Sequence, residues 1–168
     1  MTLFELNTLP KAARAEALRT CCGASAWVDA MMGIFPVATP ETLFAQAHTI
    51  WYSLTEHDWR EAFTHHPKIG DINSLKEKFA STSAWAASEQ GAVRQASQQV
   101  LETLAEGNTA YEQKFHYIFI VCATGKSAEE MLELLQARLP NPPTQEIRVA
   151  MAEQAKITEI RLQKLLTT

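Results

Sequence analysis

PETLFAQAHTIWYSL, residues 40–54, is the stretch that decides the fold class. Its apolar side chains recur at intervals of three and four residues, at Leu43, Ala47, Ile50, Trp51 and Leu54. This spacing places them in one stripe along an α-helix, and the preceding Thr39-Pro40 is a typical helix start. The segment therefore predicts an amphipathic helix with one buried face.

Helix signals continue on both sides of this segment. Before it, we expect one helix that is capped by Asn7 or Thr8 and ends near Gly23, and a second helix that stops before Pro36. After it, five more helices are expected: Thr55 to Phe63, capped by Thr55 with Asp58; about 83–106, ended by Gly107; Asn108 to Phe115; Ser127 to Leu139, capped by Ser127 with Glu130; and about 144–166.

The apolar run Tyr117 to Cys122 is the exception to the helical pattern. Its β-branched and aromatic residues have strand propensity, but the sequence offers it no obvious partner strand. We expect a buried extended segment or a distorted helix there. The predicted fold is all-α, with residues 1–168 forming a single compact domain of about eight or nine helices.

Composition narrows the functional classes. The chain has 168 residues, 15 basic against 19 acidic side chains, and a formal charge of -4, which does not favour nucleic acid as a partner. No segment approaches the ~20 apolar residues that cross a bilayer, and no secretory signal is apparent. The three cysteines, Cys21, Cys22 and Cys122, have no zinc or redox spacing. We expect reduced thiols in a cytoplasmic protein without membrane partners.

The most unusual local motif is THHPKIGD, residues 64–71. Proline fixes its own φ and restricts the residue before it, so His66 would lose little conformational entropy when held for proton transfer. A solvated turn with inactive histidines is the alternative, and on local sequence alone it is the more frequent outcome.

Three further motifs are ordinary when taken singly. SEQ at 88–90 and EQAKITEIRL at 153–162 read as helix surface, and NTAYEQKF at 108–115 reads as a capped helix. Together with HPKIGD, the GKS at 125–127 and the RLPN at 138–141, they occur in an order that is similar to one known family. From about Leu9 to Leu166 the chain resembles the 2-oxo-4-hydroxy-4-carboxy-5-ureidoimidazoline (OHCU) decarboxylases.

This resemblance implies an all-helical fold, a homodimer, and conversion of OHCU to (S)-allantoin and CO2 in the last step of urate oxidation. It also assigns site residues by position in the motifs. His66 would be the catalytic histidine, Glu89 its acidic partner and Arg161 a catalytic and substrate-binding arginine. The remaining substrate contacts implied by the family are Pro67, Gln90 and backbone groups of Phe119, Ile120 and Val121.

The chain departs from the family pattern at two places. The lead-in to the Glu-Gln pair is Ser83-Ala84-Trp85-Ala86-Ala87-Ser88, so no binding hydroxyl is assigned there. Many members have glycine after the Lys-Phe pair, where this chain has His116, a second titratable ring.

No cofactor is expected. The chain has no phosphate-binding loop, HExxH motif or dinucleotide fingerprint, and the C=N bond of OHCU can itself accept the electron pair released with CO2. One alternative is a helical protein-interaction module without catalysis. The other is a metal-dependent hydrolase using His57, His65, His66 and His116, although these lack a recognisable ligand spacing.

Overall fold

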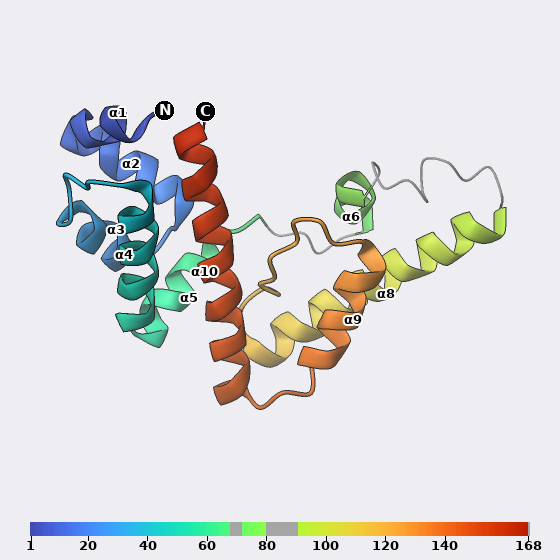
Figure 1. The fold of residues 1–168 in the computed structure, drawn as a ribbon. Helices are drawn as coiled ribbons and strands as arrows, with labels where there is room; N and C mark the ends of the chain where they lie inside the picture. The colour runs from blue at the N-terminus through green and yellow to red at the C-terminus, as the bar shows by residue number, and fades with distance from the viewer. Residues whose placement is uncertain (68–71, 80–90, 168) are drawn as a thin grey trace. The chain divides into compact units, whose positions relative to one another are not determined.

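The computed structural model describes residues 1–67, 72–79 and 91–167 (Figure 1). These ranges contain nine α-helices and no strand, so the all-α prediction is confirmed. The helices are α1 (Leu3–Thr8), α2 (Lys11–Cys21), α3 (Ser25–Met32), α4 (Pro40–Ser53), α5 (Glu56–Thr64), α6 (Ile72–Phe79), α8 (Gly91–Phe115), α9 (Ala128–Arg138) and α10 (Pro143–Thr167). Within the described ranges, none of them is long and apolar enough to cross a membrane.

Contacts between residues divide the chain into two units. The first unit comprises Met1–His66 and Val149–Thr168, and the second comprises Pro67–Arg148. The first helix turns of α10, with Glu146, therefore count with the second unit, and the rest of α10 with the first. Each unit is described separately below.

Two helix starts in the first unit follow their local signals. At α4, the Thr39 hydroxyl accepts a hydrogen bond from the Thr42 N–H at 3.1 Å, and Pro40 occupies the first helical position. At α5, Thr55 and Asp58 form a reciprocal capping box, with the Thr55 N–H donating to the carboxylate at 3.0 Å. Each bond satisfies a backbone donor that the helix itself cannot pair, so both predicted starts are confirmed.

The predicted N-terminal cap is wrong. Asn7 and Thr8 lie inside the short helix α1, whose cap is Thr2 in a capping box with Glu5, and α2 begins after Pro10. The Asn7 amide instead binds the backbone of Val37, donating to its carbonyl and accepting from its N–H, both at 2.9 Å. The correct signal was the Thr-x-x-Glu spacing at the start of the chain.

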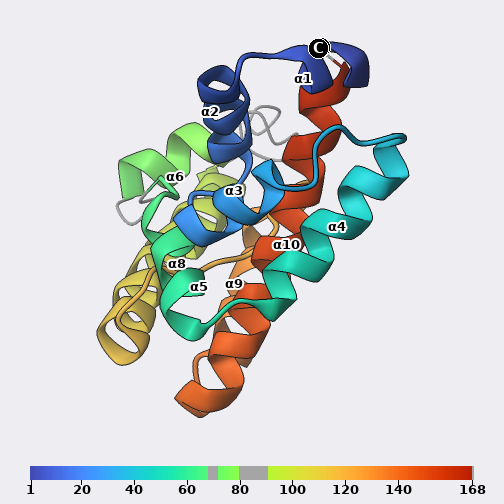
Figure 2. The same ribbon diagram turned by 90° about the vertical axis from the view of Figure 1, so that its left-hand side faces the viewer.

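Tryptophans join the helices of the first unit. The buried indoles of Trp27 and Trp51 donate to the Ala47 carbonyl at 3.1 Å and the Met151 carbonyl at 2.8 Å. Trp59 donates to the Trp51 carbonyl at 3.1 Å. These bonds connect α3 to α4, α4 to α10 and α5 to α4, and Figures 1 and 2 both show α4 alongside α10. Because each indole buries a large apolar surface and also satisfies its N–H, the core of this unit is closed without an unpaired donor at these rings.

In the second unit, α8 runs through Gly107 without interruption, which corrects the predicted break and the cap at Asn108. Gly107 faces Leu135 of α9, and a Cβ at this position would collide with the Leu135 side chain. The glycine therefore permits a close approach of α8 and α9 rather than ending a helix. The helix α6, to which no residue range was assigned from sequence, also packs on α8.

His116, which stands where many members of the resembling family have glycine, directly follows α8. His116 has φ +65°, in the left-handed region where glycine is favoured, and its N–H donates to the Glu112 carbonyl at 2.9 Å. Beyond it, Tyr117 to Cys122 has no regular secondary structure, so the distorted-helix alternative is wrong, and the segment is only in part as buried as the extended alternative required. The Ser127 hydroxyl then accepts from the Glu130 N–H at 3.2 Å and starts α9 as predicted.

Candidate active site

The histidine pair of THHPKIGD follows directly after α5. The His65 N–H donates to the Ala62 carbonyl at 3.1 Å and the His66 N–H donates to the Phe63 carbonyl at 3.3 Å, so the last helical turn holds both residues. Pro67 comes next and is exposed. The backbone of His66 is thus fixed on one side by the helix end and on the other by proline.

The two histidines differ in environment. His65 is an exposed residue whose ring packs over Gly23, and a Cβ on that glycine would collide with the ring. His66 is partly buried. Gly23 was expected to end a helix, and α2 does end nearby at Cys21, but the absence of a side chain at Gly23 also makes room for His65.

The His66 ring is held by a buried glutamine. His66 Nε2 forms a short hydrogen bond with Gln154 Oε1, and Gln154 Nε2 donates to Thr158 Oγ1 at 3.1 Å. Gln154 is 1% exposed and Thr158 is 4% exposed. Gln154, Thr158 and Arg161 are spaced by four and three residues, so they share one face of α10.

Burial is the main influence on the charge of His66. Desolvation lowers the pKa of its imidazole below the ordinary value of 6.5. The hydrogen bond that the ring donates to Gln154 raises the pKa, whereas electrostatic interactions with Arg161 and His65 lower it further. The net direction is downward, so at neutral pH the ring is uncharged and can accept a proton.

Two thiols at the end of α2 adjoin the same face of α10. Burial raises the pKa of Cys22 to about 11 and also raises that of Cys21. Thr158 is hydrogen-bonded to the Cys22 thiol, and the charge of Arg161 acts on both cysteines. Both thiols are therefore neutral at physiological pH and are poor nucleophiles. We call the hydrogen-bonded series His66, Gln154, Thr158 and Cys22 the His66 chain.

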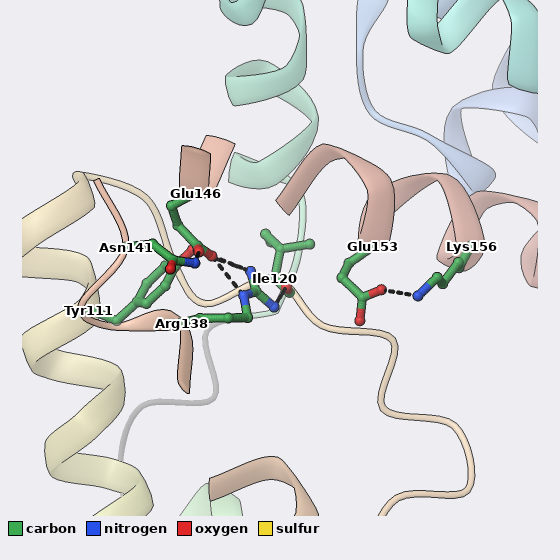
Figure 3. Close-up of polar contacts among 7 residues, drawn as sticks. All are labelled: Tyr111, Ile120, Arg138, Asn141, Glu146, Glu153 and Lys156. Atoms are coloured by element: carbon green, nitrogen blue, oxygen red, sulfur yellow. Dashed lines mark hydrogen bonds and ion pairs between the residues drawn. The ribbon is translucent and has the colours of Figure 1, made fainter. Parts of the chain in front are cut away.

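The second unit contains a buried charged cluster around Glu146, whose side chain is fully buried (Figure 3). Its carboxylate accepts from the Tyr111 hydroxyl at 2.6 Å, from Arg138 Nε at 2.7 Å and from Asn141 Nδ2 at 2.9 Å. Burial and the hydrogen bond to Glu146 raise the pKa of Tyr111, which keeps its hydroxyl protonated as the donor. We call Tyr111, Arg138, Asn141 and Glu146 the Glu146 cluster.

The Glu146 cluster fixes the apolar run in which backbone contacts to substrate were predicted. Arg138 Nη1 donates to the Ile120 carbonyl at 2.7 Å, as Figure 3 shows, and its guanidinium lies over the Phe119 ring at 4.6 Å from the centroid. Ile120 is buried, whereas Phe119 and Val121 are partly buried. Arg138 and Asn141 come from the RLPN motif, so this motif anchors the 119–121 backbone.

The predicted site residues are divided between the two units and the residues that the structure does not describe. His66 and Arg161 lie in the first unit and interact electrostatically, and Phe119, Ile120 and Val121 lie in the second. Glu89 and Gln90, like Ser83 and Ser88, lie outside the described residues. Over the described ranges no group of three or more His, Cys, Asp or Glu side chains is arranged to hold a metal ion.

Gln154 was not identified as a site residue from sequence, although its motif was. The available signal was its spacing, because a polar residue seven positions before Arg161 lies on the same helix face. Its partner His66 is 88 residues away in sequence, and no local pattern connects the two.

The chain is similar in sequence to known proteins along most of its length. The model of a family described as OHCU decarboxylase matches residues 7–163. The chain is 39% identical over 150 residues to the uric acid degradation bifunctional protein TTL of Arabidopsis thaliana, covering 88% of this chain and 45% of that protein. It is 39% identical over 59 residues to the 2-oxo-4-hydroxy-4-carboxy-5-ureidoimidazoline decarboxylase of Amia calva, covering 35% of this chain and 34% of that protein. The matches thus span less than half the length of these curated relatives.

Two solved structures resemble the fold. A crystal structure of OHCU decarboxylase in the presence of (S)-allantoin has a TM-score of 0.69 and 35% identity, covering 89% of this chain and 96% of that one. A crystal structure of (S)-allantoin synthase has a TM-score of 0.71 at 20% identity, covering 100% of this chain and 55% of that one. The second likeness concerns the fold alone.

Proposed function

Because the chain belongs to the OHCU decarboxylase family, we propose that it is a carboxy-lyase that converts OHCU to (S)-allantoin and CO2 in urate degradation. The observation that carries the proposal is the histidine of the HPKIGD motif. His66 is partly buried, uncharged at neutral pH, held by Gln154 and close to the charge of Arg161. A rigid neutral imidazole beside a cation suits proton transfer on an anionic substrate.

The decarboxylation step follows from the bonds of OHCU. The bond between the carboxylate carbon and the hydroxyl-bearing carbon breaks, and CO2 leaves. The electron pair of that bond forms a C=C bond to the ureido-bearing carbon, while the π pair of the C=N bond moves to the ring nitrogen, which takes up a proton from water. The hydroxyl proton is then removed, and the ureido-bearing carbon receives a proton on one face to give the S configuration. Because the substrate accepts the electrons itself, the protein needs only to orient it and to move protons.

Each site residue has a role in this step. His66 takes the hydroxyl proton, Glu89 stabilises the resulting imidazolium, and Arg161 binds a carboxylate or ureido oxygen through its planar donors. Pro67, Gln90 and the backbone of 119–121 contact the substrate. The hydrogen bond from Arg138 to the Ile120 carbonyl supports this last assignment, because it holds the backbone of the segment in place.

Further properties of the chain are part of the proposal. Residues 1–168 act as one domain, which is supported by a family match that spans parts of both units. The protein is a cytoplasmic homodimer without a bound cofactor, and its partners are OHCU and (S)-allantoin rather than nucleic acid or membrane.

The deciding experiment measures turnover and product handedness together. Freshly generated OHCU is added to the purified protein and the circular dichroism of allantoin is followed over time. OHCU also decays spontaneously to racemic allantoin, so we expect faster conversion and a product of S configuration. A rate equal to the spontaneous decay, or a racemic product, would overturn the proposed function and favour an interaction module.

A further inference from the structure

Gln154 is a buried glutamine with hydrogen bonds at both ends of its amide, unlike an ordinary glutamine on a helix surface. It is 1% exposed, and both ends of its amide are engaged, Oε1 by His66 Nε2 and Nε2 by Thr158 Oγ1. A buried amide group that loses its hydrogen-bond partner is destabilising, because the group stays desolvated without compensation. In the structure the amide oxygen faces the His66 ring and the amide nitrogen faces the Thr158 hydroxyl.

The orientation of the amide determines which ring nitrogen of His66 carries the proton. An amide oxygen can only accept a hydrogen bond, so a ring nitrogen that faces Oε1 must be the donor. The neutral ring is then protonated at Nε2, and its lone pair is at Nδ1. We propose that Gln154 is a positioning residue that holds His66 with Nε2 protonated and thereby presents Nδ1 as the base for the substrate hydroxyl. This inference rests on the proposed function.

Thr158 and Cys22 keep the far end of the His66 chain neutral. Thr158 accepts from the amide and is hydrogen-bonded to Cys22, whose thiol has a pKa raised by burial to about 11. Because the Cys22 thiol is neutral at neutral pH, no thiolate competes with the Thr158 hydroxyl as the acceptor for the Gln154 amide N–H. Among the described groups, Arg161 and His65 are the charged or titratable neighbours that act on His66, and both disfavour its protonation. Gln154 is the neighbour that favours it.

A purely structural role for Gln154 makes different predictions from a positioning role. If Gln154 only fills space, replacing it with methionine of similar size should leave the His66 titration unchanged. If it positions the ring, the same change removes the acceptor at Nε2, and the pKa of His66 should fall because the stabilising hydrogen bond is lost. Gln154→Glu should have the opposite effect, because a carboxylate accepts the same bond and adds a negative charge.

The first test is NMR of ¹⁵N-histidine-labelled protein without substrate, above pH 6.5. We expect His66 to be protonated at Nε2, with a ring proton that exchanges slowly with water. In Gln154→Met this proton should exchange rapidly. The matched control is Gln163→Met, on the exposed part of the same helix, which should leave the proton protected. An unprotonated Nε2 in the wild type, or protection retained in Gln154→Met, would overturn the inference.

The second test is the pH profile of kcat/KM. Gln154→Met should lower the rate roughly 10- to 100-fold, as is typical when a group that orients a reactive residue is lost, and should move the histidine limb to lower pH. Gln154→Glu should move the same limb to higher pH. A limb that stays in place, or moves in one direction in both variants, would contradict positioning through the ring.

Thr158→Val tests the next link, because valine keeps the shape but removes the hydroxyl that accepts from Gln154. Its effect on kcat/KM should be smaller than that of Gln154→Met and should largely disappear when the two are combined, since one acts through the other. Fully additive effects on kcat/KM would show that Thr158 does not act through Gln154. The NMR measurements need no OHCU, so a protein with the expected His66 titration and no turnover would refute the proposed function and leave the positioning intact.

Discussion

The His66 chain in the first unit and the Glu146 cluster in the second are both buried polar networks, but they treat charge differently. In the Glu146 cluster a carboxylate and a guanidinium compensate each other, and the tyrosine and asparagine supply further donors. The His66 chain contains an imidazole, an amide, a hydroxyl and a thiol, with no carboxylate among its described members.

The two networks therefore suit different functions. A compensated, fully hydrogen-bonded ion pair has one stable arrangement and holds the backbone at Ile120. A neutral network with a titratable ring whose pKa is lowered by burial is able to change its proton content, which is a property of reactive sites. We therefore expect mutations in the His66 chain to affect mainly turnover and mutations in the Glu146 cluster to affect mainly stability.

His66→Asn should give the largest effect. The amide keeps a polar side chain but cannot exchange protons near neutral pH, so turnover should fall about 10²–10⁴-fold while the protein still folds. Turnover is measured with OHCU, and folding by far-ultraviolet circular dichroism. His65→Asn is the control and should be much milder, because His65 is exposed. A His66→Asn rate within about threefold of wild type would remove His66 from the mechanism.

Glu146→Gln should lower the free energy of unfolding by about 3–5 kcal/mol, because it leaves the buried Arg138 charge uncompensated. Urea denaturation measures the change. Arg60→Gln is the control, since its ion pair with Glu56 is exposed and such pairs contribute only about 0–1 kcal/mol. If the two variants were equally stable, the Glu146 cluster would not be the structural anchor that we describe.

Glu89→Gln examines whether a carboxylate outside the described residues completes the His66 chain. We expect turnover to fall by about two orders of magnitude, because the amide cannot stabilise an imidazolium, while stability remains almost unchanged. The histidine limb of kcat/KM should move to lower pH, since a neighbouring negative charge is removed. A wild-type rate with an unmoved limb would leave His66 with Gln154 as its only proposed partner.

Arg161→Lys separates charge from geometry. Lysine keeps the positive charge that lowers the His66 pKa, so the pH limb should stay in place. KM should rise roughly tenfold, which corresponds to one lost charge-assisted hydrogen bond from the planar guanidinium. Steady-state kinetics over a range of pH measures both. Unchanged kinetics would return Arg161 to a surface role.

The smallest effect is on stability against pH. The folded-state pKa of His66 lies below its ordinary value of 6.5, so below pH 6.5 the unfolded chain binds a proton that the folded chain does not. The contribution of the neutral ring is fully present above pH 6.5 and decreases as the pH falls towards the folded-state value. Urea denaturation of the wild type and His66→Asn on both sides of pH 6.5 should show a steeper loss for the wild type. Equal losses of stability in the two proteins would mean that the His66 ring is solvated in the folded state.

Local signals allowed much of the fold to be predicted. Thr39-Pro40, Thr55 with Asp58, and Ser127 each act within one helix turn, so their caps could be recognised from neighbouring residues. Gly107 could not be placed in this way. A glycine at this position suggested a helix end, but the structure requires glycine there because any side chain would collide with Leu135 of α9.

The residues of the candidate site also differ in whether a local sequence signal identifies them. The motif containing His66 has a local peculiarity, a histidine before proline, that suggests a held imidazole. Gln154 and Glu146 have no such peculiarity, because glutamine and glutamate are ordinary on helix surfaces and their importance comes from burial against distant partners. Long-range burial is a property of the packed chain, and sequence spacing reveals only which helix face they share.

The tryptophan contacts of the first unit provide an optical reporter. Trp27, Trp51 and Trp59 are three of the four tryptophans in the chain, and each donates its indole N–H to a backbone carbonyl. Separating these helices would expose the indoles to water and shift their fluorescence emission to longer wavelength. The fourth tryptophan, Trp85, lies outside the described residues. In a Trp85→Phe protein, emission would follow the first unit alone while ellipticity at 222 nm would follow every helix. Coincident transitions would mean that the two units unfold as one cooperative domain.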